Sequence, residues 1–374
     1  MSKPLLLVGE STSNQNLFYK TRFLAGDPFF YLESSEASTL VVSAMELGRA
    51  QKESIVEDVR SFNDLGYVEL YRRYGDSRRA IAQLSVRLLQ EYGSNAVRVE
   101  PGLPVQFADV LRAEDFDLEI DTHMVVEERR HKCDEEIAAI AAAQAATERA
   151  LGHAVALIEA SEERAGYLHF NGIPLTSERI RAEIEIGLLR ENLVSEMEST
   201  VAGGRAAADP HARGSGPLVA HEAIVMDIFP RSRQSRYFAD ITRTVVKGTP
   251  APAVRAMYES VMRAYESALS LVRAGANGAD IHHAVLDEFR SSGYDGRPER
   301  PSMPHGTGHG IGLDIHEAPR LGEIELTLVE GDVITIEPGL YHPDIGGVRV
   351  EDAVLVTQDG YRNLTSISKR LELG

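Results

Sequence analysis

The segment Ile224-Val225-Met226-Asp227-Ile228 carries a carboxylate inside an apolar run that is typical of a strand. Three later segments share the pattern, with Asp240 before Ile241-Thr242-Arg243-Thr244-Val245-Val246, Glu337 after Val333-Ile334-Thr335-Ile336, and Glu351 after Val348-Arg349-Val350. An ionised carboxylate that is buried without a partner costs several kcal/mol of stability or takes up a proton. Four such groups predict strong compensation by cations in the folded protein.

The chain offers two kinds of compensation near these carboxylates. Arg243 and Arg349 lie close to them in the sequence, and they neutralise two carboxylates at most. A lone buried histidine is more often a structural hydrogen-bonding residue than a ligand, but His305, His309 and His316 fall within twelve residues, beside glycines. With His309 as a nitrogen donor, four carboxylates form a ligand set that suits two divalent cations. The residues therefore predict a dinuclear metal site.

The composition limits the class of protein and its partners. The chain has 374 residues, enough for two domains, and its 43% hydrophobic and 26% charged residues are typical of a soluble globular protein. Its net charge of −18 repels phosphate backbones and anionic lipids, so we expect neither nucleic acid nor a membrane surface as a partner.

The sequence also bears on location and redox chemistry. No stretch approaches the roughly 20 apolar residues that span a bilayer, and residues 1–10 do not resemble a secretory signal. We therefore expect a cytoplasmic protein. A single cysteine, Cys133, excludes an intrachain disulfide and a thiolate metal cluster, and we interpret it as an incidental thiol on a helix surface.

The predicted pattern of secondary structure changes near residue 125. Short strand patterns and helix patterns alternate from about residue 4 to 123, which predicts a small α/β domain. A run rich in Ala, Glu and Arg over 126–161 then predicts one long helix that links this domain to a second one. We expect domain boundaries at 1–124 and 125–374.

The second domain is predicted to be α+β with a largely antiparallel sheet. Thr176-Ser177-Glu178-Arg179 has the signature of a helix start, and further helices are expected over 252–274 and 278–291. The carboxylate-bearing strands lie between and after them, separated by expected turns at Gly203-Gly204, Gly214-Ser215-Gly216 and Gly346-Gly347.

The ordered set of motifs resembles the M24 metallopeptidase family, with its pita-bread fold. The matching stretches are Asp227, Asp240-Ile241-Thr242-Arg243-Thr244, His305-Gly306-Thr307-Gly308-His309-Gly310, Ile336-Glu337-Pro338-Gly339 and Arg349-Val350-Glu351-Asp352. The preceding domain resembles that of the two-domain creatinase and prolidase type. The resemblance implies a curved, largely antiparallel catalytic sheet and an Xaa-Pro aminopeptidase or Xaa-Pro dipeptidase.

The resemblance also implies a role for each site residue. Asp240 and Glu351 would bridge two metals, Asp227 would complete one, and His309 with Glu337 the other, with Mn expected and Co, Zn or Fe as alternatives. A water between the metals would be the nucleophile, with Glu337 as general base. The remaining implied roles are catalysis by His211 and His316 and substrate binding by His305 and Arg349. The implied partner is a small peptide with proline second, and a homodimer is expected.

Several of these residues have plainer interpretations. His211 fits a surface loop, and Arg349 fits a residue that only pairs with a carboxylate of the site. Tyr341 and Phe238 are expected to pack. The hairpin between the two aspartates is longer than is usual in the family, and it contains the arginines Arg231, Arg233 and Arg236. They are expected to form a solvated turn, with contact to a substrate carboxylate or a neighbouring subunit as the alternative.

Two other functions remain open at this point. A creatinase-like enzyme would act on a small guanidino or amide compound without metal, and an inactive pita-bread module would bind peptides or proteins. Both predict the loss of metal ligands. None of the five expected ligands is missing from the sequence.

Overall fold

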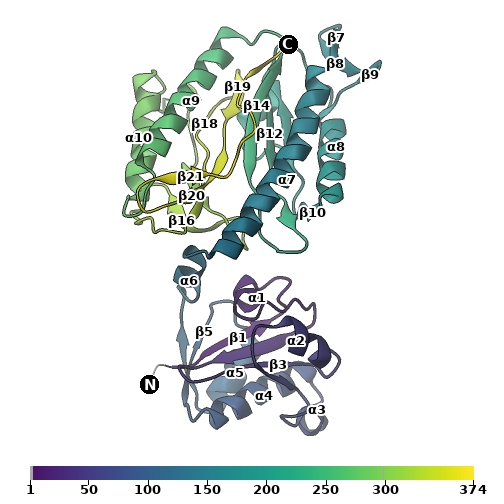
Figure 1. The fold of residues 1–374 in the computed structure, drawn as a ribbon, viewed down its shortest axis with the longest axis vertical. Coiled ribbons are helices and arrows are strands. Elements are labelled where there is room, and N and C mark those ends of the chain that lie inside the picture. The colour runs from purple at the N-terminus through teal and green to yellow at the C-terminus, as the bar shows by residue number, and fades with distance from the viewer. Residues whose placement is uncertain (1–2, 298) are drawn as a thin grey trace. The chain divides into compact units, whose positions relative to one another are not determined.

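A computed structural model describes residues 3–297 and 299–374 of the chain. Its internal contacts divide it into two compact units, Met1–Arg129 and Arg130–Gly374, which are coloured from purple to yellow along the chain in Figure 1. The boundary at residues 124 and 125 stays a prediction. Among the described residues, no helix combines the length and apolarity that crossing a bilayer requires.

The first unit is built on one mixed sheet, with the strand order β4-β3-β2-β1-β5-β6. Its strands are β1 (Leu5–Gly9), β2 (Phe29–Glu33), β3 (Ser38–Val42), β4 (Asp58–Ser61), β5 (Ala96–Val99) and β6 (Asp117–Ile120). Its helices are α1 (Gln15–Thr21), α2 (Leu47–Glu53), α3 (Tyr67–Tyr74), α4 (Ser77–Glu91) and α5 (Val105–Ala113). The expected α/β architecture is confirmed.

Both faces of this sheet are buried, because its strands carry apolar side chains at successive positions. In β1, Leu6 and Val8 belong to one core with α4, whereas Leu5 and Leu7 belong to a second core on the opposite face. Side chains of a strand point alternately to its two faces, so a continuous apolar run buries both of them.

The second unit contains four long helices and several antiparallel ribbons. The helices after residue 125 are α6 (Val126–Arg130), α7 (Asp134–Glu159), α8 (Ser177–Arg190), α9 (Pro252–Leu271) and α10 (Gly278–Ser291), with a 3₁₀ turn at Gly204–Ala208. The strands up to the second helix pair are β7 (Glu162–Arg164), β8 (Tyr167–Phe170), β9 (Ile173–Pro174), β10 (Leu193–Val194), β11 (Thr200–Gly203), β12 (Ile224–Ile228), β13 (Arg231–Ser232) and β14 (Ile241–Lys247). The later strands are β15 (Gly308–Gly310), β16 (Glu317–Leu321), β17 (Val333–Ile336), β18 (Gly339–His342), β19 (Gly346–Arg349), β20 (Asp352–Val356), β21 (Tyr361–Asn363) and β22 (Glu372–Leu373).

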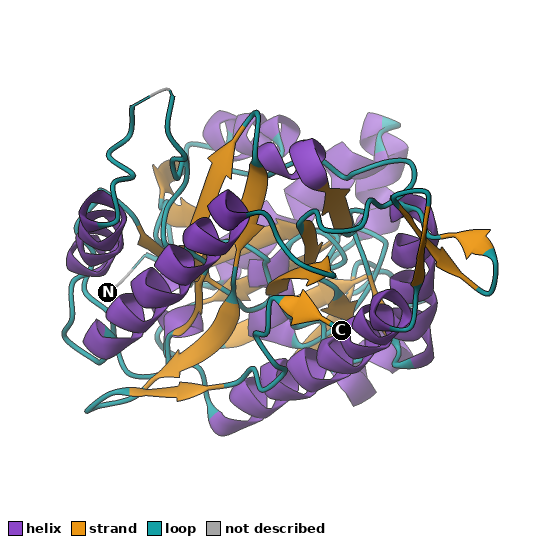
Figure 2. Ribbon diagram, turned by 90° about the horizontal axis from the view of Figure 1, so that it is seen from above, coloured by secondary structure: helices purple, strands orange, loops and turns teal. Residues whose placement is uncertain are grey.

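The second unit has two similar halves, each with a helix pair packed on antiparallel strands. Helices α7 and α8 share one core with β12 and β14, and helices α9 and α10 share another with β17 and β20. The main sheets have the orders β11-β12-β14-β22 and β16-β15-β17-β20-β21, with β14–β22 as the parallel pair. Figure 2 shows the helices, in purple, flanking the strands. The expected α+β, largely antiparallel architecture is confirmed.

The long helix expected over 126–161 is present as α7, but the expected start is wrong, because residues 126–130 form the separate helix α6. Cys133 between them is extended, with a ψ of 169°, and it is the N-cap of α7. Its backbone N–H donates to Glu136 Oε2 at 3.0 Å, and three acidic residues occupy the first turn. Negative side chains favour a helix N-terminus, so this local sequence starts a new helix.

The turn expected at Gly346-Gly347 is also wrong, because both residues lie in β19. A Cβ on Gly347 would come 1.9 Å from the carbonyl oxygen of Ala207. Glycine is therefore required here by the close approach of the 3₁₀ turn. The N-cap signature at Thr176 is present, since its side chain accepts a hydrogen bond from Arg179 N at 3.1 Å.

Candidate metal centre and active-site cavity

Two antiparallel strands position the aspartates. Asp227 lies in β12 opposite Thr242 of β14, and Asp240 lies immediately before β14. Helix α7 fixes the backbone of Asp240, because Gln144 Nε2 donates to its carbonyl oxygen at 3.0 Å and Asp240 N donates to Gln144 Oε1 at 3.1 Å. Register and helix contact thus hold both carboxylates at the same end of the hairpin.

The segment that follows β19 brings Glu351 to the same place. Glu351 N donates to the carbonyl oxygen of Thr242 at 3.1 Å, and Thr242 Oγ1 donates to Glu351 Oε2 at 2.7 Å. Thr242 of β14 therefore fixes the position of both the backbone and the side chain of Glu351.

Close backbone packing positions His309 and Glu337. A Cβ on Gly308 would come 1.9 Å from the carbonyl oxygen of Thr335, and one on Gly310 would come 2.2 Å from that of Ala318. The glycines on either side of His309 thus let β15 lie directly against its neighbours. Glu337 follows β17 and donates its backbone N–H to the carbonyl oxygen of Thr307 at 2.8 Å.

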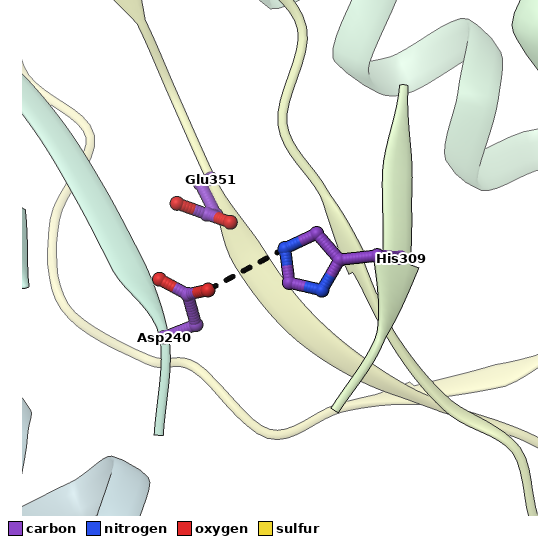
Figure 3. A group of neighbouring side chains, drawn as sticks. All are labelled: Asp240, His309 and Glu351. Atoms are coloured by element: carbon purple, nitrogen blue, oxygen red, sulfur yellow. Dashed lines mark ion pairs between the residues drawn. The ribbon is translucent and has the colours of Figure 1, made fainter. Parts of the chain in front are cut away.

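Three of the predicted metal ligands converge. Asp240, His309 and Glu351 are buried and each offers a ligand atom within 4.8 Å of the others (Figure 3). His309 Nε2 lies 3.6 Å from Asp240 Oδ2 and 3.6 Å from Glu337 Oε1. The other oxygen of Asp240, Oδ1, is buried and has no hydrogen-bond partner within the described part of the chain.

Burial shifts the pKa values of three carboxyl groups and of His309 in this cluster. Burial, and then the charges of the neighbouring carboxylates, raise the pKa of Asp240 and of Glu351 well above the usual range. Burial raises the pKa of Glu337 to about 7, although Arg349 opposes the shift. Burial, and then the nearby His316, lower the pKa of His309 to about 3.

The contacts of His309 have the character of a metal site and not of an ion pair. Figure 3 marks Asp240 and His309 as an ion pair, but a pKa of about 3 keeps the ring neutral. His309 Nδ1 lies 3.1 Å from the carbonyl oxygen of Gly310, which can only accept, so Nδ1 carries the proton and Nε2 has a lone pair. A lone pair facing carboxylate oxygens at 3.6 Å leaves room for a cation between them, and the donor set fits one.

Arg349 joins the carboxylate cluster to a histidine. Its Nη2 donates to Asp227 Oδ2 at 2.5 Å, and its Nη1 donates to Tyr341 Oη at 2.8 Å. His305 Nδ1 donates to the carbonyl oxygen of Gly306 at 2.8 Å, so its Nε2 accepts from Tyr341 Oη at 3.0 Å. Burial, and then Arg349, lower the pKa of His305 to about 4, which keeps this ring neutral as well.

All the predicted site residues border one cavity of about 650 Å³ in the second unit. Such a volume is typical of a site for a small molecule. The ring of His316 lies 4.3 Å from that of His309 in a T-shaped contact, whereas His211 is exposed in a loop at the cavity wall. The lining also includes apolar side chains that the sequence did not single out, namely Met197, Pro210, Phe229, Pro304 and Ile315.

Three of the arginines lie elsewhere than predicted. Arg243 pairs with Asp352 at 2.8 Å, so it neutralises none of the four carboxylates through its side chain. The solvated turn expected for the hairpin arginines is wrong for Arg231 and Arg236. Arg231 pairs with Glu196 at 2.5 Å with its side chain 12% exposed, and Arg236 is buried.

The sequence interpretation missed the functions of Tyr341 and Gln144. Tyr341 was expected to pack, but its hydroxyl connects Arg349 to His305. The pairing of Gly339 with Arg349 in the β18–β19 hairpin puts Tyr341 near that arginine, and the local sequence does not give this register. Nothing in the local sequence of α7 indicates that Gln144 contacts Asp240.

Comparisons with known proteins agree with this geometry. A family model, Metallopeptidase family M24, matches residues 138–358. The Xaa-Pro dipeptidase of Pyrococcus horikoshii is 28% identical over 367 residues, which cover 96% of this chain and 92% of that protein. The Xaa-Pro dipeptidase of Pyrococcus furiosus is 35% identical over 176 residues, 46% of this chain and 49% of that protein.

The solved structures show the fold. An X-Pro aminopeptidase from Thermotoga maritima superposes with a TM-score of 0.81 at 24% identity, over 99% of this chain and 97% of that one. The fold expected from the motifs, with an N-terminal α/β unit before a pita-bread unit, is thereby confirmed. Because the family model matches more than half of its residues, the chain belongs to the metallopeptidase family M24.

Proposed function

We propose that this protein is a metal-dependent exopeptidase that hydrolyses the N-terminal Xaa-Pro bond of small peptides, as an Xaa-Pro aminopeptidase or an Xaa-Pro dipeptidase. The proposal depends above all on the 3.6 Å gaps between the neutral His309 Nε2 and two carboxylates, in a cavity whose volume of about 650 Å³ suits a small ligand. The relatives that align with nearly the whole chain are named for Xaa-Pro substrates, which supports this bond as the target.

Two divalent cations, with Mn expected, would be held by five residues, Asp227, Asp240, His309, Glu337 and Glu351. Bound ions of this kind polarise a carbonyl and lower the pKa of water toward neutrality. The number of ions is supported by charge balance, because four carboxylates need more positive charge than Arg349 supplies. Burial and the neighbouring carboxylates raise the pKa of Asp240 and of Glu351, and bound cations would keep both groups ionised.

The remaining chemistry belongs to side chains of the cavity. Glu337, with a pKa near neutrality when no ion is bound, is proposed as the general base. His316 and His211 would donate hydrogen bonds to the substrate and to the developing oxyanion. Burial lowers the pKa of His316, so this ring is neutral and retains one N–H to donate.

His305 and Arg349 are proposed to bind substrate from one wall of the cavity. The hydrogen bonds through Tyr341 fix the ring of His305 and the guanidinium of Arg349 relative to each other. The homodimer and the cytoplasmic location expected from the sequence stay predictions.

The experiment is release of the N-terminal residue from Ala-Pro, Ala-Pro-Ala and Met-Ala-Ala, with creatine as an additional substrate, after chelation and after addition of Mn²⁺. Metal-dependent cleavage of the Xaa-Pro peptides supports the proposal, and the ratio between dipeptide and tripeptide separates dipeptidase from aminopeptidase. Glu351→Gln is expected to be inactive, whereas the exposed carboxylate of Asp344 is the matched control, and Asp344→Asn is expected to be active.

Other results contradict the proposal. Turnover of creatine without metal favours the creatinase-like function. Peptide binding that is equally strong with and without metal, together with no cleavage, favours the binding module. Full activity of Glu351→Gln would exclude the proposed ligand set.

A further inference from the structure

Helix α8 carries polar side chains on a face next to its apolar one. Its apolar residues at helical spacing are buried in the core that it shares with α7, and they are Ile180, Ile184 and Leu188. Glu178, Arg181 and Glu185 follow a spacing of i, i+3 and i+7, so they share one face of the helix. We call these three residues the polar stripe of α8. Each of them makes hydrogen bonds with segments 195–199 or 213–216, which border the cavity.

Arg181 holds the end of the loop that carries His211. Its Nη1 donates to the carbonyl oxygen of Arg213 at 2.5 Å, and its Nη2 donates to that of Gly214 at 3.3 Å. The same Nη1 lies 3.5 Å from the carbonyl oxygen of Ser199. A guanidinium has five N–H donors in one plane, so it can bind several carbonyl oxygens at once. Arg181 therefore ties two segments of the cavity wall to each other and to the helix.

The two glutamates of the polar stripe hold the same segments on either side of Arg181. Gly216 N donates to the carboxylate of Glu178, at 3.0 Å from Oε1 and 3.2 Å from Oε2. Glu185 Oε1 accepts from Ser195 Oγ and from Ser199 Oγ, each at 2.9 Å. Hydrogen bonds to an ionised group are roughly twice as strong as bonds between neutral groups. The stripe thus contributes charge-assisted bonds at three successive positions of the cavity wall.

The loop with His211 depends on hydrogen bonds because it contributes little to a core. Residues 208–217, all of which the structure describes, are exposed or half-buried. His211 N donates to Asp209 Oδ1 at 2.9 Å, which is a contact within the loop itself. Val201 N of β11 donates to the carbonyl oxygen of Arg213 at 3.1 Å, so this oxygen is held between a strand and α8. Segments with few buried apolar contacts open easily, and bonds from α8 oppose that opening.

We propose that the polar stripe of α8, with Arg181 at its centre, positions His211 for catalysis. The inference rests on the proposed function, in which His211 donates a hydrogen bond to the substrate and to the developing oxyanion. A displacement of a catalytic group by about 1 Å can cost about a hundredfold in rate. Arg181 is not among the described residues that line the cavity, so it acts through the backbone of the loop and not by contact with substrate.

The test is a double-mutant cycle between Arg181 and His211 in the Mn²⁺-loaded enzyme, with Ala-Pro or Ala-Pro-Ala as substrate, whichever is cleaved faster. Arg181→Met is expected to lower kcat by about ten- to hundredfold and to change KM by less than about threefold, because the group that it displaces acts in the transition state. His211→Ala should lower kcat by at least as much. The double variant should equal His211→Ala within about twofold, because its loop no longer carries the histidine.

Three further variants and one measurement extend the cycle. Glu178→Ala removes the acceptor of Gly216 N from an exposed position, so it should lower kcat in the same direction even if Arg181→Met folds poorly. Arg181→Lys should recover part of the loss because it keeps the charge. Arg190→Met is the matched control, because Arg190 is an exposed arginine in the last turn of the same helix. Hydrogen exchange of the amides of 211–216 should be faster in Arg181→Met and unchanged in Arg190→Met.

The outcomes separate this inference from the proposed function. Wild-type kcat in Arg181→Met, a loss that multiplies with that of His211→Ala, or wild-type activity of His211→Ala overturns the positioning role and leaves the exopeptidase intact. A role of Arg181 in stability alone would give the first of these results together with a lower Tm. No cleavage of either peptide by metal-loaded wild type overturns the proposed function, and the inference with it.

Discussion

Asp240→Asn should make the metal-free protein more stable while it removes metal binding. Asp240 is 4% exposed, its Oδ1 lacks a hydrogen-bond partner among the described residues, and burial with nearby carboxylates raises its pKa well above the usual range. Without metal, folding at neutral pH must either bury this charge or protonate the group. An asparagine side chain has nearly the same shape and is neutral, so its burial requires neither a buried charge nor the uptake of a proton.

The size of the effect follows from proton linkage. A carboxyl whose pKa is raised in the folded state binds more protons when folded than when unfolded, so stability falls as pH rises above the unfolded value of 3.8. The loss is about 1.4 kcal/mol per pH unit until the folded pKa is reached. The advantage of asparagine is therefore at most about 1.6 kcal/mol at pH 5 and about 4 kcal/mol at pH 7. For a unit of this size, 1 kcal/mol corresponds to roughly 2–4 °C in Tm.

Thermal unfolding in chelator at pH 5 and at pH 7, followed by circular dichroism, measures this difference. The variant should unfold at a higher temperature than wild type, and the difference in Tm between them should be larger at pH 7 than at pH 5. Added Mn²⁺ should stabilise wild type and leave the variant unchanged, because a ligand stabilises only the state that binds it. A variant that is less stable than wild type in chelator at both pH values, or that gains as much from Mn²⁺, would refute the reasoning.

Three further predictions concern other groups of the second unit. His316→Ala should retain metal, measured by elemental analysis, and lose about two to four decades of kcat. Arg243→Met removes the 2.8 Å partner of buried Asp352, so it should destabilise the protein by about 3 kcal/mol in chemical denaturation and leave the metal content of folded protein unchanged. Mn²⁺ binding should release protons, because the pKa values of Asp240 and Glu351 are raised in the metal-free protein. Calorimetry in buffers of different ionisation enthalpy measures the number of protons released per bound ion, and this number should be larger at pH 6 than at pH 8. Equal release at both values would contradict the raised pKa values.

Local sequence was sufficient to predict most of the elements. Helix α10 has the bounds expected from its pattern, Gly278–Ser291, and the Thr176 signature starts α8 one residue later. Apolar runs with a central carboxylate predicted β12 and the strand before Glu337. These features depend on periodicity and capping, which act over a few residues. The break between α6 and α7 was missed because the capping contact of Cys133 with Glu136 competes with an otherwise uninterrupted helical pattern.

Long-range contacts explain what the sequence could not predict. Gln144 meets Asp240 across 96 residues, and Arg349 meets Asp227 across 122. Arg243 was expected near the carboxylate cluster, but the alternation of β14 sends its side chain to Asp352 on the opposite side from Thr242. The partner of a charged side chain depends on strand register, and register is set by the whole sheet.

The contacts of Arg349 connect the two roles that the sequence left open for this residue, namely pairing with a carboxylate of the site and binding of substrate. Its 2.5 Å bond to Asp227 neutralises one carboxylate of the cluster, and its 2.8 Å bond to Tyr341 continues to His305 on the cavity wall. A change at Arg349 therefore alters the charge at the metal centre and the orientation of His305 together. Because the guanidinium is buried and bonded on each of its nitrogens, its effect on a substrate is transmitted through Tyr341 and His305 as well as through its own contacts. Neutralisation of Asp227 and support of the substrate wall are thus two consequences of the same hydrogen-bond network.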